Sequence, residues 1–339
     1  MKNNPDSGTP VSRRDFVSRL ALASAAWPIV ATAAHAQSNT AKEKSAASAN
    51  RAGATGSGRL GPLHVFSKPL QFLSYDETAK IIAEAGFGGI DYTVRPGGHV
   101  LPENVKEDLP RAVEAAKKAG LEVEMITTGI TSAQDKHTEP LLRTAADLGV
   151  KIYRFGNFAY DEKLGVQGSL QKHRKTLEEL ATLNQSLGIH GAIQNHAGTR
   201  LGGAVWDIYE VLHDIDPRWA GVQYDIRHAV AEGGQSWPVA LELVAPWIRC
   251  IDLKDFKWEQ TPGKATIENV PIGEGIVPFD AYFKRVSELN IHGPVSVHFE
   301  YPPFARARIP EAEKRPLLLA AMKKDLAALE PLFAKHKLR

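Results

Sequence analysis

Residues that can exchange protons or bind charged groups follow a series of short apolar runs along this chain. Carboxylates and imidazoles can move protons near neutral pH, while guanidinium and ammonium groups bind anions or neutralise a developing negative charge. A single polar cluster is common at a solvated strand end, but several that meet in space would form a site for acid–base chemistry. Six clusters follow such runs: Arg95 to His99, Arg154 to Asn157, Gln194-Asn195-His196, Asp225 to His228, Asp252-Leu253-Lys254-Asp255 and His298-Phe299-Glu300-Tyr301.

The apolar runs themselves predict β-strands, and segments with helical periodicity lie between them. Glycine follows four of these helices just before the next strand, which is typical of a helix C-terminus (Gly86, Gly120, Gly149 and Gly188). The expected strands are 63–66, 89–93, 122–127, 152–155, 191–195, 221–224, 248–253 and 295–299. The expected helices are 76–85, 104–119, 139–148, 170–187, 205–212, 239–244, 279–289 and 312–335.

Eight strands alternating with eight helices predict an α/β fold, a single (β/α)₈ TIM barrel over residues 61–339. An open doubly wound sheet is the alternative, but it usually carries a glycine-rich phosphate loop after its first strand. The segment at that place, Ser67-Lys68-Pro69-Leu70, is no such loop. Chemistry in a barrel of this type lies at the C-terminal ends of the strands, where the polar clusters fall.

The first 60 residues have a different composition from the rest of the chain. Arg13 and Arg14, an apolar run over 20–33 and the small-residue site Ala34-His35-Ala36 predict a twin-arginine signal peptide over 1–36 and a periplasmic location. The alternative is an ordinary amphipathic helix with two arginines. The apolar run is too short for a stable membrane anchor, and the Ser-, Ala- and Gly-rich residues 37–60 predict a disordered linker.

Net charge and cysteine content exclude several kinds of partner and site. The chain has 41 basic and 39 acidic residues, and removal of 1–36 takes away four basic and two acidic ones, which leaves 37 of each. A neutral mature chain gives no support for nucleic acid or an anionic membrane as a partner. Its one cysteine, Cys250, falls in an expected strand and excludes both an intrachain disulfide and a cysteine-based metal site.

Five motifs in order resemble the sugar phosphate isomerase/epimerase family, also described as xylose isomerase-like or AP endonuclease family 2 barrels. The resemblance covers residues 61 to 305 and implies the same barrel and a small, sugar-like substrate. Its motifs are Ile193-Gln194-Asn195-His196, Asp225-x-x-His228, Leu253-Lys254-Asp255-Phe256, Pro271-Ile272-Gly273-Glu274-Gly275 and His298-Phe299-Glu300-Tyr301.

The resemblance also implies a divalent metal ion. Members of the family hold it with Glu, Asp, His and Glu at the ends of strands 5 to 8, and the matching residues here are Gln194, Asp225, Asp252 and Glu300. Two positions therefore depart from the family pattern, although the set keeps three negative charges. Oxygen ligands of this kind suit Mn²⁺, Mg²⁺ or Co²⁺.

Family members commonly move a proton next to a carbonyl, which implies catalytic roles for some of these residues. Glu300 is the expected base, and Lys254 is expected to neutralise charge on a substrate oxygen. Gln194 cannot exchange protons, so a symmetric epimerisation between two glutamates is not expected, and His196 or His228 would act as the second group. Candidate substrate-binding residues are His99, Arg95, Asn195, Arg227 and Trp258, and Arg154 could also bind a carboxylate or phosphate.

The leading hypothesis is thus an isomerase or epimerase of a sugar or sugar derivative. Two alternatives stay open. A lyase or glycoside-cleaving enzyme on an oxidised sugar would begin with the same proton removal, and a non-catalytic periplasmic carbohydrate-binding protein is suggested by Gln194. A DNA-repair endonuclease, which one of the family's names suggests, is disfavoured because its metal sites need more histidines and acids than the strand ends supply.

Overall fold

A computed structural model describes residues 60–304 and 309–339 of the chain. The expected signal peptide and all of the expected linker except Leu60 lie outside these residues, and Leu60 opens the first strand. Within the described ranges, no helix has both the length and the apolar character that crossing a membrane requires.

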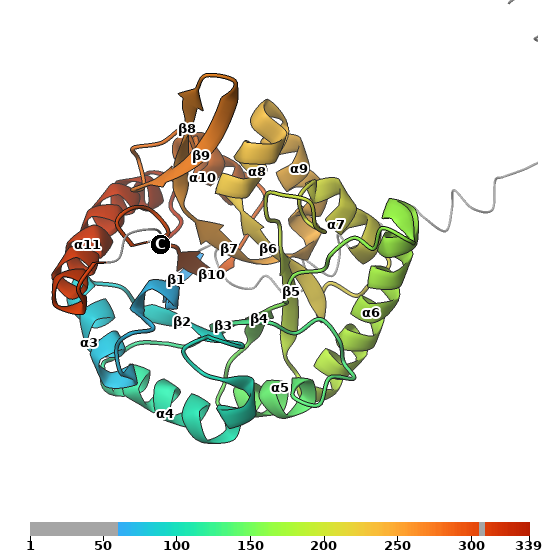
Figure 1. The fold of residues 1–339 in the computed structure, drawn as a ribbon, viewed down its shortest axis with the longest axis horizontal. Helices are drawn as coiled ribbons and strands as arrows, with labels where there is room; N and C mark the ends of the chain where they lie inside the picture. Colours follow the sequence, from blue (N-terminus) through green and yellow to red (C-terminus); the bar gives the residue numbers. More distant parts are fainter. Residues whose placement is uncertain (1–59, 305–308) are drawn as a thin grey trace, which may run out of the picture. The chain divides into compact units, whose positions relative to one another are not determined.

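Eight parallel strands close into a barrel, as the alternating pattern predicts (Figure 1). β1 pairs with both β2 and β10, and this double pairing closes the ring. The remaining neighbours follow chain order, which is the arrangement of a (β/α)₈ barrel. The barrel strands are β1 (Leu60–Phe66), β2 (Gly89–Val94), β3 (Met125–Thr128), β4 (Ile152–Arg154), β5 (His190–Gln194), β6 (Ala220–Asp225), β7 (Ile248–Leu253) and β10 (Gly293–Val297).

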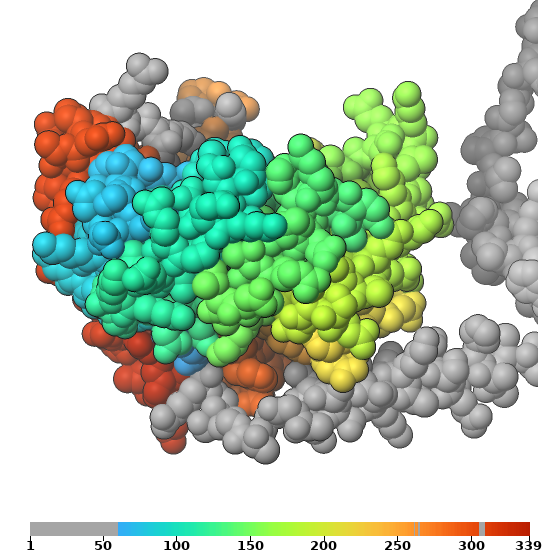
Figure 2. Space-filling view, turned by 90° about the horizontal axis from the view of Figure 1, so that it is seen from below, coloured from blue at the N-terminus to red at the C-terminus, as the bar shows by residue number. Residues whose placement is uncertain are grey.

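The helices form a ring outside the strands (Figure 1). Neighbouring helices contact one another along the ring, and α11 packs against α3, where the chain closes on itself. Figure 2 shows one side of this ring, on which the early helices follow one another in colour from blue to yellow-green. The helices are α3 (Tyr75–Ala85), α4 (Val105–Lys118), α5 (Thr138–Asp147), α6 (Gly165–Leu187), α7 (Val205–Leu212), α8 (Ile226–Gly233), α9 (Trp237–Val244), α10 (Phe279–Glu288) and α11 (Glu311–Lys335).

Local signals explain where several helices begin and end. Ser74 and Glu77 form a reciprocal capping box at the start of α3, which satisfies backbone N–H groups that the first turn leaves unpaired. Gly86 ends the same helix with a φ of 93°, and Gly188 ends α6 with a φ of 68°. These left-handed conformations suit glycine, so the four glycine positions identified from the sequence are confirmed as turns with positive φ.

One helix and one two-stranded hairpin were missing from the sequence-based prediction. Helix α8 begins directly after Asp225, whose side chain accepts a hydrogen bond from the backbone N–H of His228 and caps the helix. The segment after β7 was expected to be a loop but forms an antiparallel hairpin, β8 (Asp255–Thr261) with β9 (Lys264–Val270). The hairpin lies outside the barrel and was overlooked because its residues are largely polar.

The barrel interior has an apolar part and a polar part. Met125, Ile152, Ala192 and Cys250 form a small buried cluster, so Cys250 packs in the core as expected. Closer to the C-terminal strand ends lie buried polar side chains. The Asp91 carboxylate accepts hydrogen bonds from Thr127 and Ser296, and the Asp252 carboxylate accepts one of 2.6 Å from Gln223. These pairs hold the acids of the interior in place.

Helix α11 is attached to the barrel through a buried carboxyl group. Asp325 accepts a 3.2 Å hydrogen bond from the backbone N–H of Ile272 and a 3.3 Å hydrogen bond from the Tyr301 hydroxyl. Burial raises the pKa of Asp325 to about 7. Deprotonation of this group near neutral pH therefore places a charge inside the fold.

Candidate active site

Two adjoining cavities open at the C-terminal end of the barrel, with volumes of about 310 and 180 Å³. Four residues line both: Lys68, His196, Lys254 and Glu300. The larger cavity adds Arg227, His228, Glu259, Glu268, Asn269 and Pro302, and the smaller adds Phe66, Arg95, Arg154, Asn157, Gln194, Arg200 and His298. The polar clusters that follow separate strands in the sequence thus meet at one rim.

The ammonium group of Lys254 lies at the centre of this rim. Its Nζ atom is 3.1 Å from Asp225 Oδ2 and 3.1 Å from Glu300 Oε2, and the side chain is only 4 % exposed. Burial opposes the charge, but the carboxylates of Asp225 and Glu300 outweigh it and raise the pKa of Lys254. Lys254 is therefore a fixed positive charge at neutral pH.

Glu300 is the carboxylate of the centre that reaches the cavities. Its side chain is 19 % exposed, whereas that of Asp225 is fully buried. Lys68 binds the other oxygen of Glu300 at 2.7 Å. Burial disfavours the charged form, but the cations of Lys254, His298 and Lys68 outweigh it and hold the pKa of Glu300 well below its usual value. Glu300 is therefore ionised, and each of its two oxygens faces an ammonium group.

Gln194 presents its amide nitrogen to the acids of the centre. Nε2 donates hydrogen bonds of 2.9 Å to Asp225 and 2.6 Å to Asp252, while Oε1 accepts a 2.8 Å hydrogen bond from Arg154. This assignment is the one that places donors against acceptors on both sides of the amide, because ionised carboxylates only accept and a guanidinium only donates.

The imidazole of His298 bridges two acids. Nε2 lies 3.4 Å from Asp252 Oδ1, and Nδ1 lies 3.7 Å from Glu300 Oε2. Burial lowers the pKa of such a group, but the carboxylate of Asp252 and its hydrogen-bonding interactions outweigh this effect and raise the pKa of His298. The two acids thus favour the protonated form of His298.

These contacts test whether the four expected metal ligands fit a divalent ion. Gln194, Asp225, Asp252 and Glu300 do come together, but the oxygens that would bind metal face N–H donors from Gln194, Lys254 and His298. In the described part of the chain, no group of three or more His, Cys, Asp or Glu side chains is arranged to hold a metal ion. In this arrangement the set does not fit a divalent cation, because Gln194 turns its amide nitrogen, which is a donor, toward the acids and its oxygen toward Arg154.

His196 and His228 lie side by side, with ring centroids 3.9 Å apart. Burial, together with the nearby Lys254, lowers the pKa of His196 to about 4, so this ring is neutral at neutral pH. Its Nδ1 lies 2.9 Å from the carbonyl oxygen of Ala197 and therefore carries the proton, which leaves Nε2 as an acceptor. His228 is almost completely buried, and its Nδ1 accepts a 2.8 Å hydrogen bond from Arg227.

The other predicted substrate-binding residues have different fates. Arg227 lines the larger cavity, but its guanidinium is held by Asn269 Oδ1 at 2.6 and 3.1 Å. Asn195 is buried and bridges β5 to β6, since its amide bonds both the N–H and the carbonyl oxygen of Asp225. Asn195 thus positions the backbone of Asp225 and does not line either cavity.

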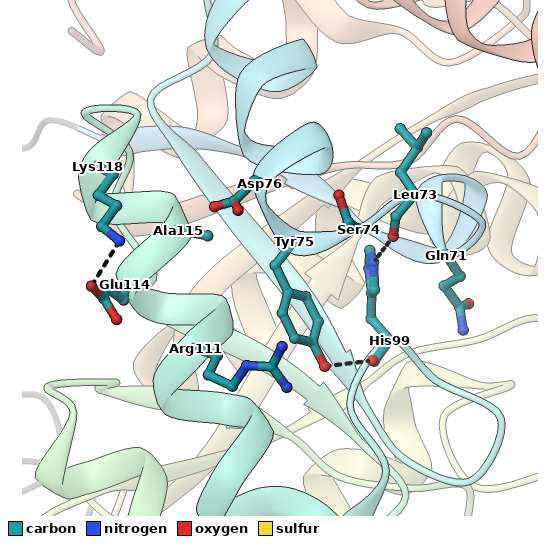
Figure 3. Close-up of a pocket in the computed structure, with 10 residues that line it drawn as sticks. All are labelled: Gln71, Leu73, Ser74, Tyr75, Asp76, His99, Arg111, Glu114, Ala115 and Lys118. Atoms are coloured by element: carbon teal, nitrogen blue, oxygen red, sulfur yellow. Dashed lines mark hydrogen bonds and ion pairs between the residues drawn. The ribbon is translucent and has the colours of Figure 1, made fainter.

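His99 and Trp258 lie away from the cavities at the barrel rim. His99 lines a separate cavity of about 470 Å³ between the start of α3 and α4, where its ring nitrogen bonds the carbonyl oxygen of Leu73 at 3.1 Å (Figure 3). Tyr75 donates a 3.2 Å hydrogen bond to the backbone oxygen of His99 (Figure 3). Trp258 is 44 % exposed on the hairpin and packs against Phe256.

Several cavity residues were missed by sequence reasoning. Lys68 lies two residues after the end of β1, so its place at a strand end was an available signal. Glu259, Glu268 and Asn269 reach the larger cavity because the hairpin folds over it, and Arg200 comes from the loop after β5. Nothing in the local sequence marks these four, since their position depends on the path of long connections.

Asp255 explains two of the sequence motifs. One of its oxygens accepts hydrogen bonds from the N–H groups of Gly273 and Gly275, at 3.0 and 2.9 Å, and the other accepts from Phe256 and Val277. A Cβ atom at Gly275 would overlap Asp255 Oδ1 and the carbonyl oxygen of Phe256. The Gly-Glu-Gly segment is thus wrapped around Asp255, next to Lys254, and helps to fix the end of β7.

A family model for xylose isomerase-like TIM barrels matches residues 79–323. The chain belongs to this family. No curated protein sequence matches it. Similar solved structures include L-ribulose 3-epimerase, which is 14 % identical with a TM-score of 0.61 over 82 % of this chain and 96 % of that one. A xylose isomerase-like TIM barrel protein from Mycobacterium smegmatis in complex with magnesium is 16 % identical, with a TM-score of 0.58 over 80 % and 100 % of the two chains.

A third similar structure is the probable 3-DHS dehydratase AsbF from Bacillus anthracis, involved in petrobactin synthesis. It is 18 % identical, and the match has a TM-score of 0.56 over 78 % of this chain and 98 % of that chain. At these identities the likeness to each structure shows the fold alone. The neighbours nevertheless illustrate that this fold occurs in epimerases and in a probable dehydratase, and that one neighbour is in complex with magnesium.

Proposed function

We propose that this chain is a sugar-modifying enzyme that moves a proton on the carbon next to a carbonyl group. The observation that carries the proposal is the contact of the ionised Glu300 with the Lys254 ammonium, 3.1 Å apart, where the two cavities meet. A base and a fixed positive charge in one cleft are what enolisation needs, since one removes the proton and the other stabilises the oxygen anion that forms. The family and its neighbouring epimerases support a sugar-like substrate.

In the proposed reaction, Glu300 takes the proton as the C–H electron pair moves toward the carbonyl and negative charge collects on its oxygen. Lys254 stabilises that oxygen, and His196 passes the hydroxyl proton between the two substrate oxygens. Return of the carbon-bound proton from Glu300 to the neighbouring carbon completes an isomerisation on one face of the substrate. Gln194 has an amide where a second carboxylate would be needed, and its amide nitrogen is hydrogen-bonded to Asp225 and Asp252. A symmetric epimerisation with two carboxylate bases is therefore not proposed.

The family resemblance implies a divalent ion, Mn²⁺, Mg²⁺ or Co²⁺, as the positive charge of the site. We propose that Lys254 and His298 supply this charge in its place. Wild-type protein dialysed against a chelator should keep its activity and contain less than one metal ion per ten chains by mass spectrometry. The double variant Gln194→Glu/Lys254→Met restores the acid and removes the ammonium, so it should bind Mn²⁺ more tightly than wild type does. Activity that returns only on addition of a divalent ion would overturn this assignment.

Exchange of substrate hydrogen with D₂O tests the chemistry itself. Wild-type protein is incubated with a panel of aldoses, ketoses, oxidised sugars and sugar acids, and deuterium is located by NMR. We expect deuterium at the carbon next to the carbonyl, lost in Glu300→Gln. The matched control is Glu242→Gln, which changes an exposed glutamate paired with Arg285 on the outer surface.

The outcomes separate the candidate functions. Exchange without loss of a substituent supports the isomerase, whereas exchange followed by loss of a neighbouring substituent identifies the lyase. Full exchange by Glu300→Gln refutes the assigned base. Binding of sugars without exchange by any panel member refutes the enzyme and leaves the carbohydrate-binding protein.

A further inference from the structure

The two cavities at the barrel rim differ in charge. The larger one is lined by Arg227, Lys68 and Lys254 together with three carboxylates, those of Glu259, Glu268 and Glu300. The lining of the smaller one has a single carboxylate, that of Glu300, at its border with the larger cavity. The same lining holds five lysine and arginine side chains, those of Lys68, Arg95, Arg154, Arg200 and Lys254. We call the smaller cavity the arginine pocket.

Three arginines of this pocket have no carboxylate partner in the described residues. Arg95 and Arg154 both lie over the ring of Phe66, with guanidinium carbons 5.8 and 5.5 Å from its centre. The hydrogen bond of Arg154 goes to the neutral Gln194. Nowhere in the described part of the chain does the side chain of Arg95 or Arg200 meet an acid within ion-pair distance.

Nearby acids do not neutralise these groups. The carboxylate of Glu300 attracts the guanidinium of Arg95, but it is already paired with Lys68 and Lys254. Asp91 acts on Arg95 as well but is buried below the pocket and accepts hydrogen bonds from Thr127 and Ser296. Burial, followed by repulsion from Arg154, lowers the pKa of Arg95. Two like charges held on one aromatic ring without an acid are unfavourable unless an anion joins them.

We propose that the arginine pocket binds the anionic group of the substrate, a carboxylate or a phosphoryl group, through Arg95, Arg154 and Arg200. Guanidinium groups suit both anions, because their N–H groups pair with two oxygens in parallel. The inference rests on the proposed function for the orientation of the substrate. With its anionic group in this pocket, the reacting carbons lie at the junction formed by Lys254 and Glu300, and the rest of the molecule extends into the larger cavity.

Arg227 is excluded from this role by its own contacts. Both its Nε and Nη2 atoms donate to Asn269, and Asn269 in turn donates a 3.0 Å hydrogen bond to the carbonyl oxygen of Glu300. Arg227 therefore ties the hairpin to the barrel. Among the candidates from the sequence, Arg95 and Arg154 are thus selected, and Arg200 is added.

Isothermal titration calorimetry with three probes, D-glucose, D-glucuronate and D-glucose 6-phosphate, tests the proposal. We expect at least one anionic probe to bind wild-type protein about tenfold or more tightly than glucose does, since hydrogen bonds to charged groups are the strong ones. Arg95→Met and Arg154→Met should each lose about tenfold in affinity for that probe and less than threefold for glucose. The better anionic probe distinguishes a carboxylate substrate from a phosphorylated one.

The control is Arg143→Met, which removes an exposed arginine paired with Glu139 on α5 and should leave every affinity unchanged. A second measurement needs no ligand. Because Arg95 is repelled by Arg154, Arg95→Met should be at least as stable to heat as wild type in buffer without polyvalent anions. Equal binding of all three probes, failure of both anions to bind at millimolar concentration, or a large loss of stability in Arg95→Met overturns the proposal.

Deuterium exchange separates this inference from the proposed function. If wild type and Arg95→Met both exchange hydrogen on a neutral sugar, and anionic probes bind no more tightly than neutral ones, the proton transfer is supported and the anion site is refuted. Arginine-dependent binding of an anionic probe, with no exchange on any sugar, supports the anion site and refutes the proton transfer.

Discussion

Replacing Lys254 by methionine removes the positive charge at the centre of the site while keeping most of the volume of the side chain. Lys254 contacts Asp225 and Glu300 at 3.1 Å each and is 4 % exposed. In the variant, Asp225 loses the one ammonium partner that it has among the described residues while remaining fully buried. It keeps hydrogen bonds from Gln194 and from the backbone N–H of His228.

The magnitude follows from these contacts. Breaking a buried ion pair on one side costs about 3–5 kcal/mol, because the remaining charge stays desolvated. Glu300 adds little, since it is partly exposed and still bound by Lys68, so we expect a loss near 3 kcal/mol in the free energy of unfolding. For a domain of this size that corresponds to roughly 5 °C in Tm. Turnover should fall by about 10²–10³, the usual effect of removing one group that stabilises an oxyanion.

Urea unfolding followed by tryptophan fluorescence measures the stability change in a double-mutant cycle with Asp225→Asn. In Lys254→Met/Asp225→Asn neither charge is left buried alone, so the double variant should be more stable than the sum of the single changes predicts, by about 2 kcal/mol. A loss below about 1 kcal/mol in Lys254→Met, the scale of a surface ion pair, or additive effects in the cycle would refute the view that Lys254 is the essential counter-charge.

Three further predictions concern other parts of the chain. The pKa of Asp325 is raised in the folded state, so the stability linked to its protonation is lost as pH rises from about 4 to 7. In urea unfolding, the free energy of unfolding of Asp325→Asn should therefore rise by roughly 2 kcal/mol relative to that of wild type between pH 5 and pH 7. A difference between the two proteins that does not change with pH would contradict this. Gly275→Ala should destabilise by about 1–3 kcal/mol in the same assay, because the added Cβ overlaps Asp255 and backbone; wild-type stability would show that the segment around Asp255 can move. Arg13→Lys/Arg14→Lys should abolish export, measured by fractionation of a producing cell, and unchanged export would argue against a twin-arginine signal.

Much of the architecture was predictable because it depends on local patterns. The strand Ile248–Leu253 and the helix Val205–Leu212 occur at the predicted residues, and most other boundaries differ by one to three residues. Apolar periodicity and glycine caps specify such elements without reference to the rest of the chain. The hairpin 255–270 was missed because most of its residues are polar, although Pro262-Gly263 marks its turn and apolar residues alternate with polar ones on both strands.

The site residues divide in the same way. Glu300, Lys254, His196 and His228 could be placed at the rim from the sequence, because the C-terminal ends of parallel strands meet there. His99 could not be placed correctly, since the loop after β2 turns it outward to the cavity beside α3 (Figure 3).

What the sequence by itself determined was the barrel, the rim and the departure of Gln194 from the family pattern. What only the tertiary structure decided was which donors and which acceptors face one another within that rim. The amide of Gln194 points its nitrogen at the acids because Arg154 from β4 takes its oxygen, and Lys254 reaches Asp225 and Glu300 from a third strand. Such contacts join residues that are 29 to 46 positions apart in the sequence, so their geometry exists only once the barrel has closed.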